Sequence, residues 1–411
     1  MSIAQYLRRH AEADTAFTQH LHTDWQHVLC VPAYDEADAL PKLLASVKSA
    51  ENLLLILLIN SPQSAQGTAS LTGTQASVTA LLQQYPLLDS LTGNCKLLQF
   101  NAHDSHLLLL ERYALPDKEA VGLARKIACD IACKLIDEKK IRSPWIHNSD
   151  ADVILPADYL QASEQLDTET AAALFAFRHA PEPDHALQAG LNLYEYSLYY
   201  YVEALKWAGS PYAFHTIGST LLVHHKYYAL ARGFPKRAAG EDFYLLNKLA
   251  KTGRIHSLTA PVITLSGRRS LRVPFGTGPA IGRIGEMAQR ETNYLYYHPL
   301  CFRYLQEWLR LMPSLWETRN FRKHMNNTIL LNCLTELGVE TAIAHALQHS
   351  KSRESFTRHM HNWFDAFRTL KLIHLLRNKG LASISRPELQ TLKHDFAFIG
   401  SAEQSMQRTR H

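Results

Sequence analysis

Short apolar runs alternate with helical patterns along the first two thirds of the chain. Apolar residues that recur every third or fourth position indicate helices, and short apolar runs that end at Gly, Pro, Asn or acidic residues indicate buried strands. The predicted strands are 27–33, 53–60, 96–101, 144–147, 171–178, 216–223 and 261–265. The predicted helices are 1–24, 38–50, 119–139, 186–208 and 243–251. Segment 61–76 is predicted as a loop and 102–118 as irregular. Because strands alternate with helices, the predicted fold class is α/β, with a mostly parallel central sheet flanked by helices.

The pattern changes near residue 280. The segments beyond it are predicted helices rich in aromatic and basic residues: 291–312, 318–337, 339–350 and 354–379. We therefore divide the chain into an α/β domain, 1–280, and a helical C-terminal region, 281–411. Residues 301–411 hold 16 Lys and Arg against 9 Asp and Glu, although the formal net charge of the whole chain is only +5. This basic region is compatible with contact to phosphates or to an anionic membrane, and the alternative is a packed helical subdomain with a solvated face.

The chain lacks the sequence signals of several protein classes. The longest apolar run, 53–59, has strand length, whereas a membrane span takes about 18 apolar residues. Residues 1–22 contain charged side chains and no apolar segment of a signal peptide, so the expected location is the cytoplasm, with peripheral contact at the inner face of the membrane. The glycine-rich motifs of dinucleotide-binding and P-loop proteins are missing, and we expect no nucleic-acid partner.

Two aspartates follow the strand predicted at 144–147. In the triplet Asp150-Ala151-Asp152 the two carboxylates are two residues apart, and side chains at that spacing in an extended chain project to the same side. Carboxylate oxygens suit Mg²⁺ and Mn²⁺, and α/β proteins bind ligands at the carboxyl ends of parallel strands. Such a triplet is expected about once by chance in a chain of this length, but this one directly follows an apolar strand. We expect Asp150 and Asp152 to hold a divalent metal.

The first predicted strand ends in Val31-Pro32-Ala33-Tyr34-Asp35-Glu36. Pro32 lacks a backbone donor and suits a strand that is ending. Tyr34 offers an aromatic face on which a base could stack, and the two acids offer acceptors for base or ribose donors. The alternative is a strand end followed by a helix start, with acids that complement the helix dipole.

Two acids also open the helix predicted at 243–251. In Gly240-Glu241-Asp242, the functional interpretation makes Asp242 a general base that removes the proton of a hydroxyl. The helix N-terminus is expected to keep this carboxylate ionised at neutral pH. Dipole complementation alone is the alternative explanation of the two acids.

Two glycine-containing segments, one of them basic, complete the candidate site. Gly218 and Ser219 begin a predicted strand where backbone could approach a ligand, although a strand with a turn is the plainer interpretation. Arg268 and Arg272 lie in a basic, glycine-rich segment, and arginine suits bidentate recognition of phosphate. A surface loop is the alternative for that segment.

Taken in order, these segments resemble the family 2 glycosyltransferases of the GT-A fold. Residues 31–36 are similar to the opening strand motif of the family, VPxYNE, with Asp35 where Asn is commoner. Residues 149–152 resemble its D-x-D metal motif, and 240–242 resemble its acidic motif, in which the Asp is the catalytic base. Residues 234–243 and 122–125 also resemble the segments that precede those motifs in the family. The resemblance covers about 27–265.

The resemblance implies an inverting transferase that uses a nucleotide-diphosphate sugar and Mn²⁺ or Mg²⁺, with Asp242 as base. The expected donor contacts are Pro32, Tyr34, Glu36, Asn60, Arg125, Asp150 and Asp152. The expected acceptor contacts are Gly218, Ser219, Glu241, Arg268 and Arg272.

Many members carry an Asp that reads the base where this chain has Asn60-Ser61, so the donor base stays open, with a UDP-sugar expected first and a GDP-sugar second. The processive motif QxxRW is missing, which favours transfer of a single sugar to a hydroxyl acceptor. On this interpretation 281–411 binds the acceptor, forms an oligomer or contacts a membrane.

Two other functions use related chemistry. A sugar-phosphate nucleotidyltransferase also holds Mg²⁺ with carboxylates, but it would need a glycine- and lysine-rich loop after its first strand, where this chain has the acidic segment 34–37. A non-catalytic carbohydrate-binding protein of the same fold is the third possibility, and the intact acids of both acidic motifs argue against it.

Overall fold

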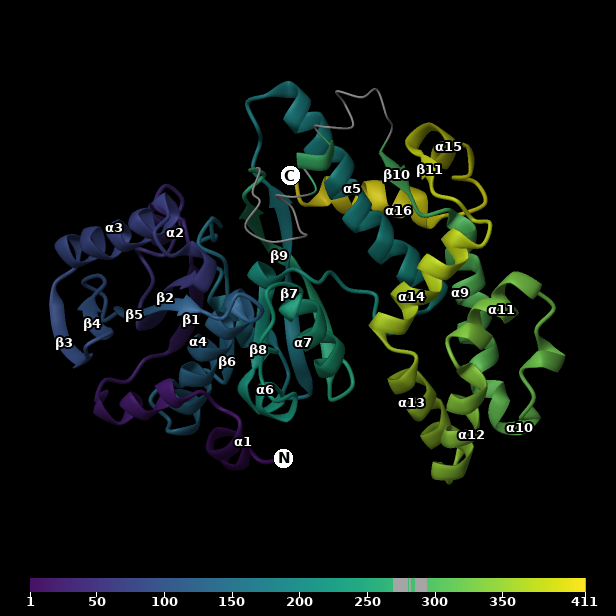
Figure 1. Ribbon diagram of the computed structural model, residues 1–411, viewed down its shortest axis with the longest axis horizontal. Coiled ribbons are helices and arrows are strands. Elements are labelled where there is room, and N and C mark those ends of the chain that lie inside the picture. The colour runs from purple at the N-terminus through teal and green to yellow at the C-terminus, as the bar shows by residue number, and fades with distance from the viewer. Residues whose placement is uncertain (269–279, 281, 285–293, 411) are drawn as a thin grey trace. The chain divides into compact units, whose positions relative to one another are not determined.

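The computed structural model describes the chain except for residues 269–279, 281, 285–293 and 411 (Figure 1). It consists of two compact units. The first comprises Met1–Pro181 and Thr216–Pro279, and the second comprises Glu182–His215 and Ala280–His411.

The first unit is built on a twisted sheet that has nine strands in the described residues, in the order β3-β4-β5-β2-β1-β6-β8-β7-β9. The strands are β1 (His27–Ala33), β2 (Leu53–Pro62), β3 (Leu87–Thr92), β4 (Cys95–Gln99), β5 (His106–Leu115), β6 (Trp145–Asn148), β7 (Thr170–His179), β8 (Leu221–His224) and β9 (Arg254–Leu265). At its centre, β5, β2, β1 and β6 run parallel, whereas β8 is antiparallel to both β6 and β7. The predicted α/β class with a mostly parallel central sheet is confirmed.

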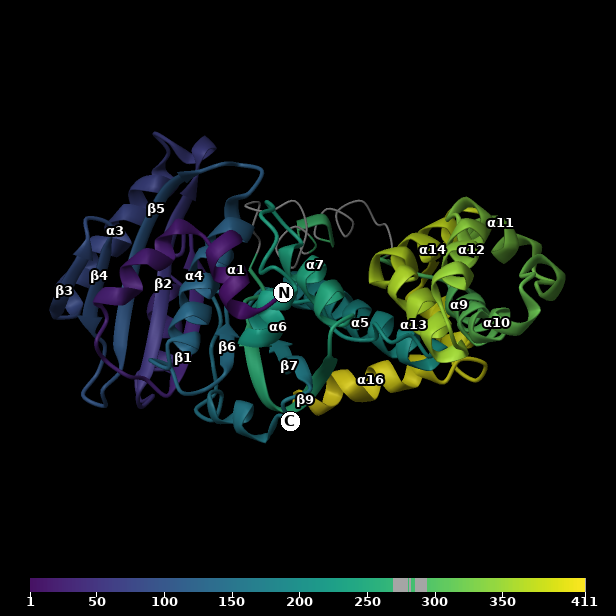
Figure 2. The same ribbon diagram turned by 90° about the horizontal axis from the view of Figure 1, so that it is seen from below.

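Helices cover this sheet. They are α1 (Ile3–Arg9), α2 (Leu40–Ser46), α3 (Ala69–Gln84), α4 (Ala120–Asp137), α6 (His225–Leu230) and α7 (Glu241–Leu249), with short 3-10 helices η1 (Ala13–His20), η2 (Gln63–Ala65), η3 (Gln161–Gln165) and η4 (Gly218–Thr220). Helix α4 packs against β1 and β2 with nearly every side chain buried, and Figure 2 shows α1 beside it.

The pairing of β1 with β6 places two motifs at the same edge of the sheet. Both strands are fully buried and parallel, with Cys30 opposite Asn148, so their carboxyl ends lie side by side. Because β8 runs antiparallel to β6, η4 at the start of β8 lies at this edge as well. Gly240 begins α7 with a φ of 71°, a conformation that glycine adopts without strain.

The second unit is helical. Its elements are α5 (His185–Ala208), β10 (Leu295–Tyr296), α9 (Pro299–Leu311), η5 (Met312–Ser314), α10 (Leu315–Thr318), η6 (Arg322–His324), α11 (Thr328–Glu336), α12 (Val339–His349), α13 (Arg353–Trp363), α14 (Ala366–Asn378), β11 (Ile384–Ser385), α15 (Arg386–Thr391) and α16 (Phe398–Arg408). Helix α5 packs against α9 and α16. Aromatic rings on these helices meet edge-on, such as Tyr200 with Phe302 at a centroid distance of 5.7 Å.

Several predicted elements differ from the structure. In the second unit, the helix predicted at 291–312 contains β10 before α9, the one at 318–337 is broken into η6 and α11, and the one at 354–379 into α13 and α14. In the first unit, β3 was not predicted. Segment 102–118 contains β5, a run of buried leucines that is ordered by pairing with β2 and β4, and a sequence pattern does not show such partners. Segment 61–76 contains the first half of α3. Thr68 caps the N-terminus of this helix by accepting a hydrogen bond from the N–H of Leu71. The helix predicted at 1–24 is split into α1 and η1, and the strand predicted at 216–223 begins as η4.

The domain division predicted at residue 280 also differs from the structure in one respect. The second unit does resume at Ala280, but it also includes Glu182–His215, which we expected in the first domain. The reason is the apolar face of α5, which packs against α9 and α16 in the second unit.

Candidate active site

Arg125 connects the two acidic motifs. It projects from α4, and its guanidinium Nε donates to Glu241 Oε1 at 2.8 Å while Nη2 forms an ion pair with Asp150. Nη1 donates a third hydrogen bond to the backbone carbonyl of Ser149 at 3.3 Å. The side chain is only 3 % exposed. One buried guanidinium therefore fixes the position of the D-x-D segment relative to the start of α7.

Burial and charge act on Arg125 in opposite directions. Burial alone would lower the pKa of Arg125, but the carboxylates of Asp150 and Glu241 raise it above its ordinary value. The guanidinium therefore stays charged.

Gly218 leaves room for this guanidinium. A Cβ added at Gly218 would lie 2.7 Å from Arg125 Nη2, so the absence of a side chain there leaves the space that the guanidinium occupies.

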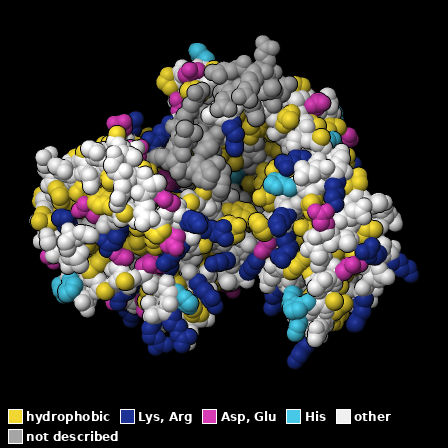
Figure 3. All heavy atoms as spheres, in the orientation of Figure 1, with side chains coloured by type: hydrophobic (Ala, Val, Ile, Leu, Met, Phe, Trp, Pro, Cys, Tyr) yellow, Lys and Arg dark blue, Asp and Glu magenta, His cyan; other side chains and the backbone are white. Residues whose placement is uncertain are grey.

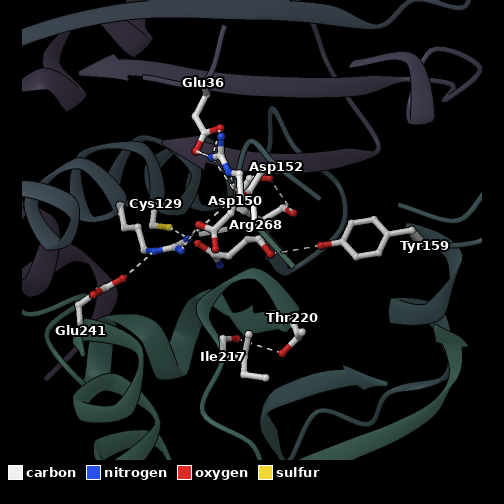
Figure 4. A network of polar contacts seen from close by, with 12 residues as sticks. Glu36, Cys129, Asp150, Asp152, Tyr159, Ile217, Thr220, Glu241 and Arg268 are labelled. Carbon is white, nitrogen blue, oxygen red and sulfur yellow. Dashed lines mark hydrogen bonds and ion pairs between the residues drawn. The ribbon is translucent and has the colours of Figure 1, made fainter. Parts of the chain in front are cut away.

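Arg268, three residues beyond the end of β9, lies between the carboxylates of Glu36 and Asp152 (Figure 4). Its Nη2 pairs with both oxygens of Glu36 and lies 3.2 Å from Asp152 Oδ2, and Nε lies 3.3 Å from the same oxygen. Burial lowers the pKa of Arg268, but Glu36 and Asp152 outweigh it and raise the pKa. The structure thus brings the predicted acceptor residue Arg268 together with two predicted donor residues.

Asp242 lies in the first turn of α7 and is half-buried. Burial and the neighbouring carboxylate of Glu241 raise its pKa from 3.8 to about 7. Arg125 and the backbone N–H of Phe243, which donates to Asp242 Oδ1 at 2.7 Å, oppose the shift only in part. The expectation that the helix N-terminus keeps Asp242 fully ionised at neutral pH is therefore wrong, because desolvation and like charge outweigh the helix dipole.

The end of β1 is held by α3 and β2. Asp35 has a φ of 56°, and its N–H donates to Thr74 Oγ1 while its carboxylate accepts from Ser70 Oγ, both at 3.0 Å. Asn60 is buried, and its Nδ2 donates to the carbonyls of Ala33 at 3.3 Å and Leu58 at 3.2 Å. The structure therefore gives Asn60 a bracing role between β1 and β2.

The remaining predicted residues lie as follows. Pro32 is buried within β1, Tyr34 is half-buried just beyond it, and Ser219 is buried in η4. Arg272 lies outside the described residues. The described site residues have more acidic than basic side chains, which we call the acidic balance of the site. The two guanidiniums are those of Arg125 and Arg268, and the five carboxylates are those of Glu36, Asp150, Asp152, Glu241 and Asp242.

The carboxylates fit a divalent cation in the chemistry of their donor atoms. The side chains of Asp150 and Asp152 are 38 % and 22 % exposed, so both can be reached from solvent. Two carboxylates together with phosphate oxygens of a substrate form a ligand set that Mg²⁺ commonly uses. In the part of the chain that the structure describes, no group of three or more His, Cys, Asp or Glu side chains is arranged to hold a metal ion.

Several residues that support the site were not predicted. Asn148, directly before the D-x-D segment, accepts a hydrogen bond from Cys129 Sγ at 2.9 Å through its side chain and one from Tyr159 at 3.4 Å through its carbonyl. Ser70 and Thr74 lie in a segment that was predicted as a loop. Only the position of Asn148, between a strand and two aspartates, gave a signal in the sequence.

Two large aromatic side chains of the basic C-terminal region are buried within the second unit. Phe302 and Trp308 are fully buried, whereas Arg303, Arg310 and Arg322 are exposed. On the face drawn in Figure 3, Lys and Arg side chains are spread among acidic, histidine and apolar ones. None of the helices described is both long and apolar enough to span a membrane.

Comparison with known proteins gives structural neighbours at low similarity. No protein-family model matches the chain, and no curated protein matches it. Among solved structures, S. aureus TarS 1–349 in complex with UDP-GlcNAc is 12% identical, with 86% of this chain and 90% of that chain covered and a TM-score of 0.37. Mannosyl-3-phosphoglycerate synthase from Rubrobacter xylanophilus is 14% identical, with 72% and 90% covered and a TM-score of 0.29. At these TM-scores the likeness decides nothing about function, and the residues of the site carry the argument.

Proposed function

We propose that this chain is a glycosyltransferase of the GT-A type. It transfers a single sugar from a nucleotide-diphosphate sugar to a hydroxyl acceptor, with inversion at the anomeric carbon. The observation that carries the proposal is the ion-pair bridge of Arg125 between Asp150 and Glu241, the residue next to Asp242. The D-x-D segment and the proposed base are thereby held by one side chain, as a reaction that couples a leaving diphosphate to an attacking hydroxyl requires.

Asp242 acts as the general base in this proposal. Its carboxylate accepts the proton of the acceptor hydroxyl while the hydroxyl oxygen forms a bond to the anomeric carbon. The bond from that carbon to the diphosphate oxygen breaks, and the nucleoside diphosphate leaves with the electron pair. A pKa of about 7 suits this role, because a base whose pKa lies near the working pH is partly ionised and still accepts a proton readily.

Asp152 and Asp150 would hold the divalent cation, Mn²⁺ or Mg²⁺. When bound, the cation supplies positive charge that neutralises the leaving diphosphate. The acidic balance of the site supports this role, because an anionic donor placed beside five carboxylates needs more positive charge than two guanidiniums provide. Tyr34 would stack on the base, which we propose is uracil first and guanine second. Glu36 and Arg268 lie beside Asp152 and would contact the donor as well.

Transfer from a panel of UDP-, GDP- and dTDP-sugars with Mn²⁺ tests the proposal. We expect turnover with one of these donors and a fall of roughly 10²-fold or more in Asp242→Asn, because a positioned base contributes about 10²–10⁴-fold. Asp152→Asn should also lose transfer. The exposed Asp167, which pairs with Arg254 at the surface, provides the control variant Asp167→Asn, which should transfer at the wild-type rate.

Three results would contradict the proposal. Full transfer by both Asp152→Asn and Asp242→Asn would remove the roles assigned to these residues. Release of pyrophosphate from a nucleoside triphosphate and a sugar phosphate would identify a nucleotidyltransferase. Metal-independent sugar binding in calorimetry without turnover would identify a carbohydrate-binding protein.

We also propose that the second unit contacts an anionic membrane through its exposed basic residues, at the cytoplasmic face. Because Phe302 and Trp308 are buried, this contact would be electrostatic rather than insertion of aromatic side chains. Binding to anionic vesicles at low salt should therefore disappear at high salt. Sedimentation with no bound fraction at low salt would rule the contact out.

A further inference from the structure

Arg268 and the proposed divalent cation need the same carboxylate. Nη2 and Nε of Arg268 lie 3.2 and 3.3 Å from Asp152 Oδ2, and Asp152 is one of the two residues to which the proposed function assigns the cation. The guanidinium and a divalent cation repel each other, so both cannot be held fully by Asp152 at the same time. Arg125 pairs in the same way with Asp150, the other proposed cation ligand, but its side chain is only 3 % exposed and has less room to move than that of Arg268.

Glu36 determines where Arg268 rests. Glu36 is only 8 % exposed on its side chain, and both of its oxygens pair with Arg268 Nη2. Arg268 itself is 35 % exposed, so it has room to leave Asp152. The forked guanidinium suits the oxygens of a diphosphate as well as those of a carboxylate. Arg268 can therefore pair with the carboxylates of Glu36 and Asp152 in the absence of a donor, or with the diphosphate of a bound donor.

We propose that Arg268 competes with the divalent cation for Asp152, and that its transfer from Asp152 to the donor diphosphate couples cation binding to donor binding. The inference rests on the proposed function and adds a regulatory residue to it. Without a nucleotide, Arg268 neutralises Asp152 and the cation binds weakly. With a nucleoside diphosphate, Arg268 pairs with phosphate, its charge is withdrawn from Asp152, and the cation binds there more tightly. By linkage, the cation raises the affinity for the nucleotide by the same factor.

Mn²⁺ binding to the full chain tests this directly, by calorimetry and by the electron paramagnetic resonance signal of free Mn²⁺, with and without UDP. For Mn²⁺ alone, Arg268→Gln should bind about fivefold or more tightly than the wild type, within the usual range of coupling between sites. The gain in Mn²⁺ affinity on adding UDP should be smaller in Arg268→Gln than in the wild type. If uracil is not the base that the site accepts, GDP replaces UDP as the probe.

Arg254 offers a matched control. It also bridges two carboxylates, Asp167 at 2.8 Å and Glu169 at 3.1 Å, but in an exposed position away from the described site residues. Arg254→Gln removes the same charge and should leave Mn²⁺ affinity unchanged. Arg268→Lys keeps the charge but cannot hold Glu36 and Asp152 through one fork, so its affinity for Mn²⁺ alone should lie between those of the wild type and Arg268→Gln. Thermal unfolding of each variant checks that it is folded, and Arg268→Lys serves as the test if Arg268→Gln is not.

The outcomes separate this inference from the proposed function. If the wild type binds Mn²⁺ with UDP, but neither Arg268 variant binds Mn²⁺ alone more tightly than the wild type, competition is overturned and the proposed cation role stands. An equal gain in Arg254→Gln would also overturn it, because net charge alone would then explain the effect. If no protein binds Mn²⁺ at millimolar concentration even with a nucleoside diphosphate, the cation role and the inference both fail.

Discussion

At the scale of single residues, the site is defined by how carboxylates are paired. Glu241 and Asp150 share Arg125, Glu36 and Asp152 share Arg268, and Asp242 has weaker compensation from Arg125 and the N–H of Phe243. The carboxylate whose charge is compensated least is the one that the mechanism needs as a proton acceptor. Its protonation near neutral pH therefore has two measurable consequences.

The first consequence concerns activity. Because Asp242 must be ionised to accept a proton, kcat/KM should rise with pH through an apparent pKa near 7 and then level off. Glu241→Gln removes the like charge that helps to raise this pKa, so the acidic limb should move to lower pH. A pH–rate profile of both proteins with the same donor and acceptor measures the shift. A limb that stays in place, or moves to higher pH, would contradict the assigned cause.

The second consequence concerns stability. The pKa of Asp242 is about 7 in the fold and near 3.8 in the unfolded chain, so the folded state binds the extra proton between these values. The free energy of unfolding should therefore fall as pH rises from about 4 to 7, and the loss remains above pH 7. Asp242→Asn removes this penalty and should be more stable than the wild type at pH 8 by roughly 1–3 kcal/mol, after allowance for partial exposure. Urea unfolding at pH 4 and pH 8 measures it, and equal differences at both pH values would contradict the prediction.

At the scale of elements, α4 is the support of the site. Gly122 in its first turn donates its N–H to the carbonyl of Arg237 at 2.9 Å, in the segment that leads into Gly240. One turn further, Arg125 reaches the two acidic motifs, and Asp130 accepts hydrogen bonds from Tyr6 of α1 and Tyr228 of α6. The helix therefore fixes the start of α7 through backbone contact and through Arg125.

Substitution of Gly122 tests this support. A Cβ at Gly122 would lie 2.5 Å from the backbone nitrogen of Arg237, so Gly122→Ala must displace α4 or the segment before Gly240. We expect a stability loss of about 1–3 kcal/mol and a fall in kcat, because Arg125 and Asp242 are moved apart. Urea unfolding and steady-state kinetics measure both effects.

Gly73 in α3 provides the matched control. Apart from the glycine itself, its two neighbours and the backbone of its own helix, no heavy atom of the described residues lies within 4 Å of a Cβ built at Gly73. Gly73→Ala should therefore stabilise the protein by about 0.5–1 kcal/mol, because alanine loses less backbone entropy in a helix. A stabilising Gly122→Ala, or one as active as Gly73→Ala, would show that α4 does not position the site as described.

At the scale of the whole molecule, the chain enters the second unit twice. Helix α5 belongs to the second unit, although its sequence lies between β7 and β8 of the first. Its buried face includes Tyr196, Tyr199 and Tyr200, which pack within the second unit. The two units are therefore not separable at one point of the chain.

A truncated chain that ends at residue 280 tests this division. It would retain α5 without α9 and α16, which exposes the apolar face of α5, and we expect it to aggregate. Replacing 182–215 in that truncated chain by a short glycine-serine linker should restore a monodisperse first unit. Size-exclusion chromatography with light scattering measures the outcome. A monodisperse chain 1–280 that retains α5 would favour the simpler division that we predicted from the sequence.

The amino-acid pattern was enough to predict those elements whose residues signal their own environment. The buried strands β1, β2 and β6 and the helix α4 follow from apolar runs and periodicity, and the acidic motifs stand at strand and helix ends that the same patterns locate. Which charged side chains form ion pairs became known only from the folded chain. Arg125 and Glu241 are 116 residues apart, and Arg268 and Glu36 are 232 apart, so no periodic pattern connects them. For the same reason β5 was missed and α5 was assigned to the wrong unit, because their packing partners are strands and helices distant in the sequence. Local periodicity reports which face of an element is buried, whereas ion pairs and unit membership depend on which surfaces the folded chain brings together.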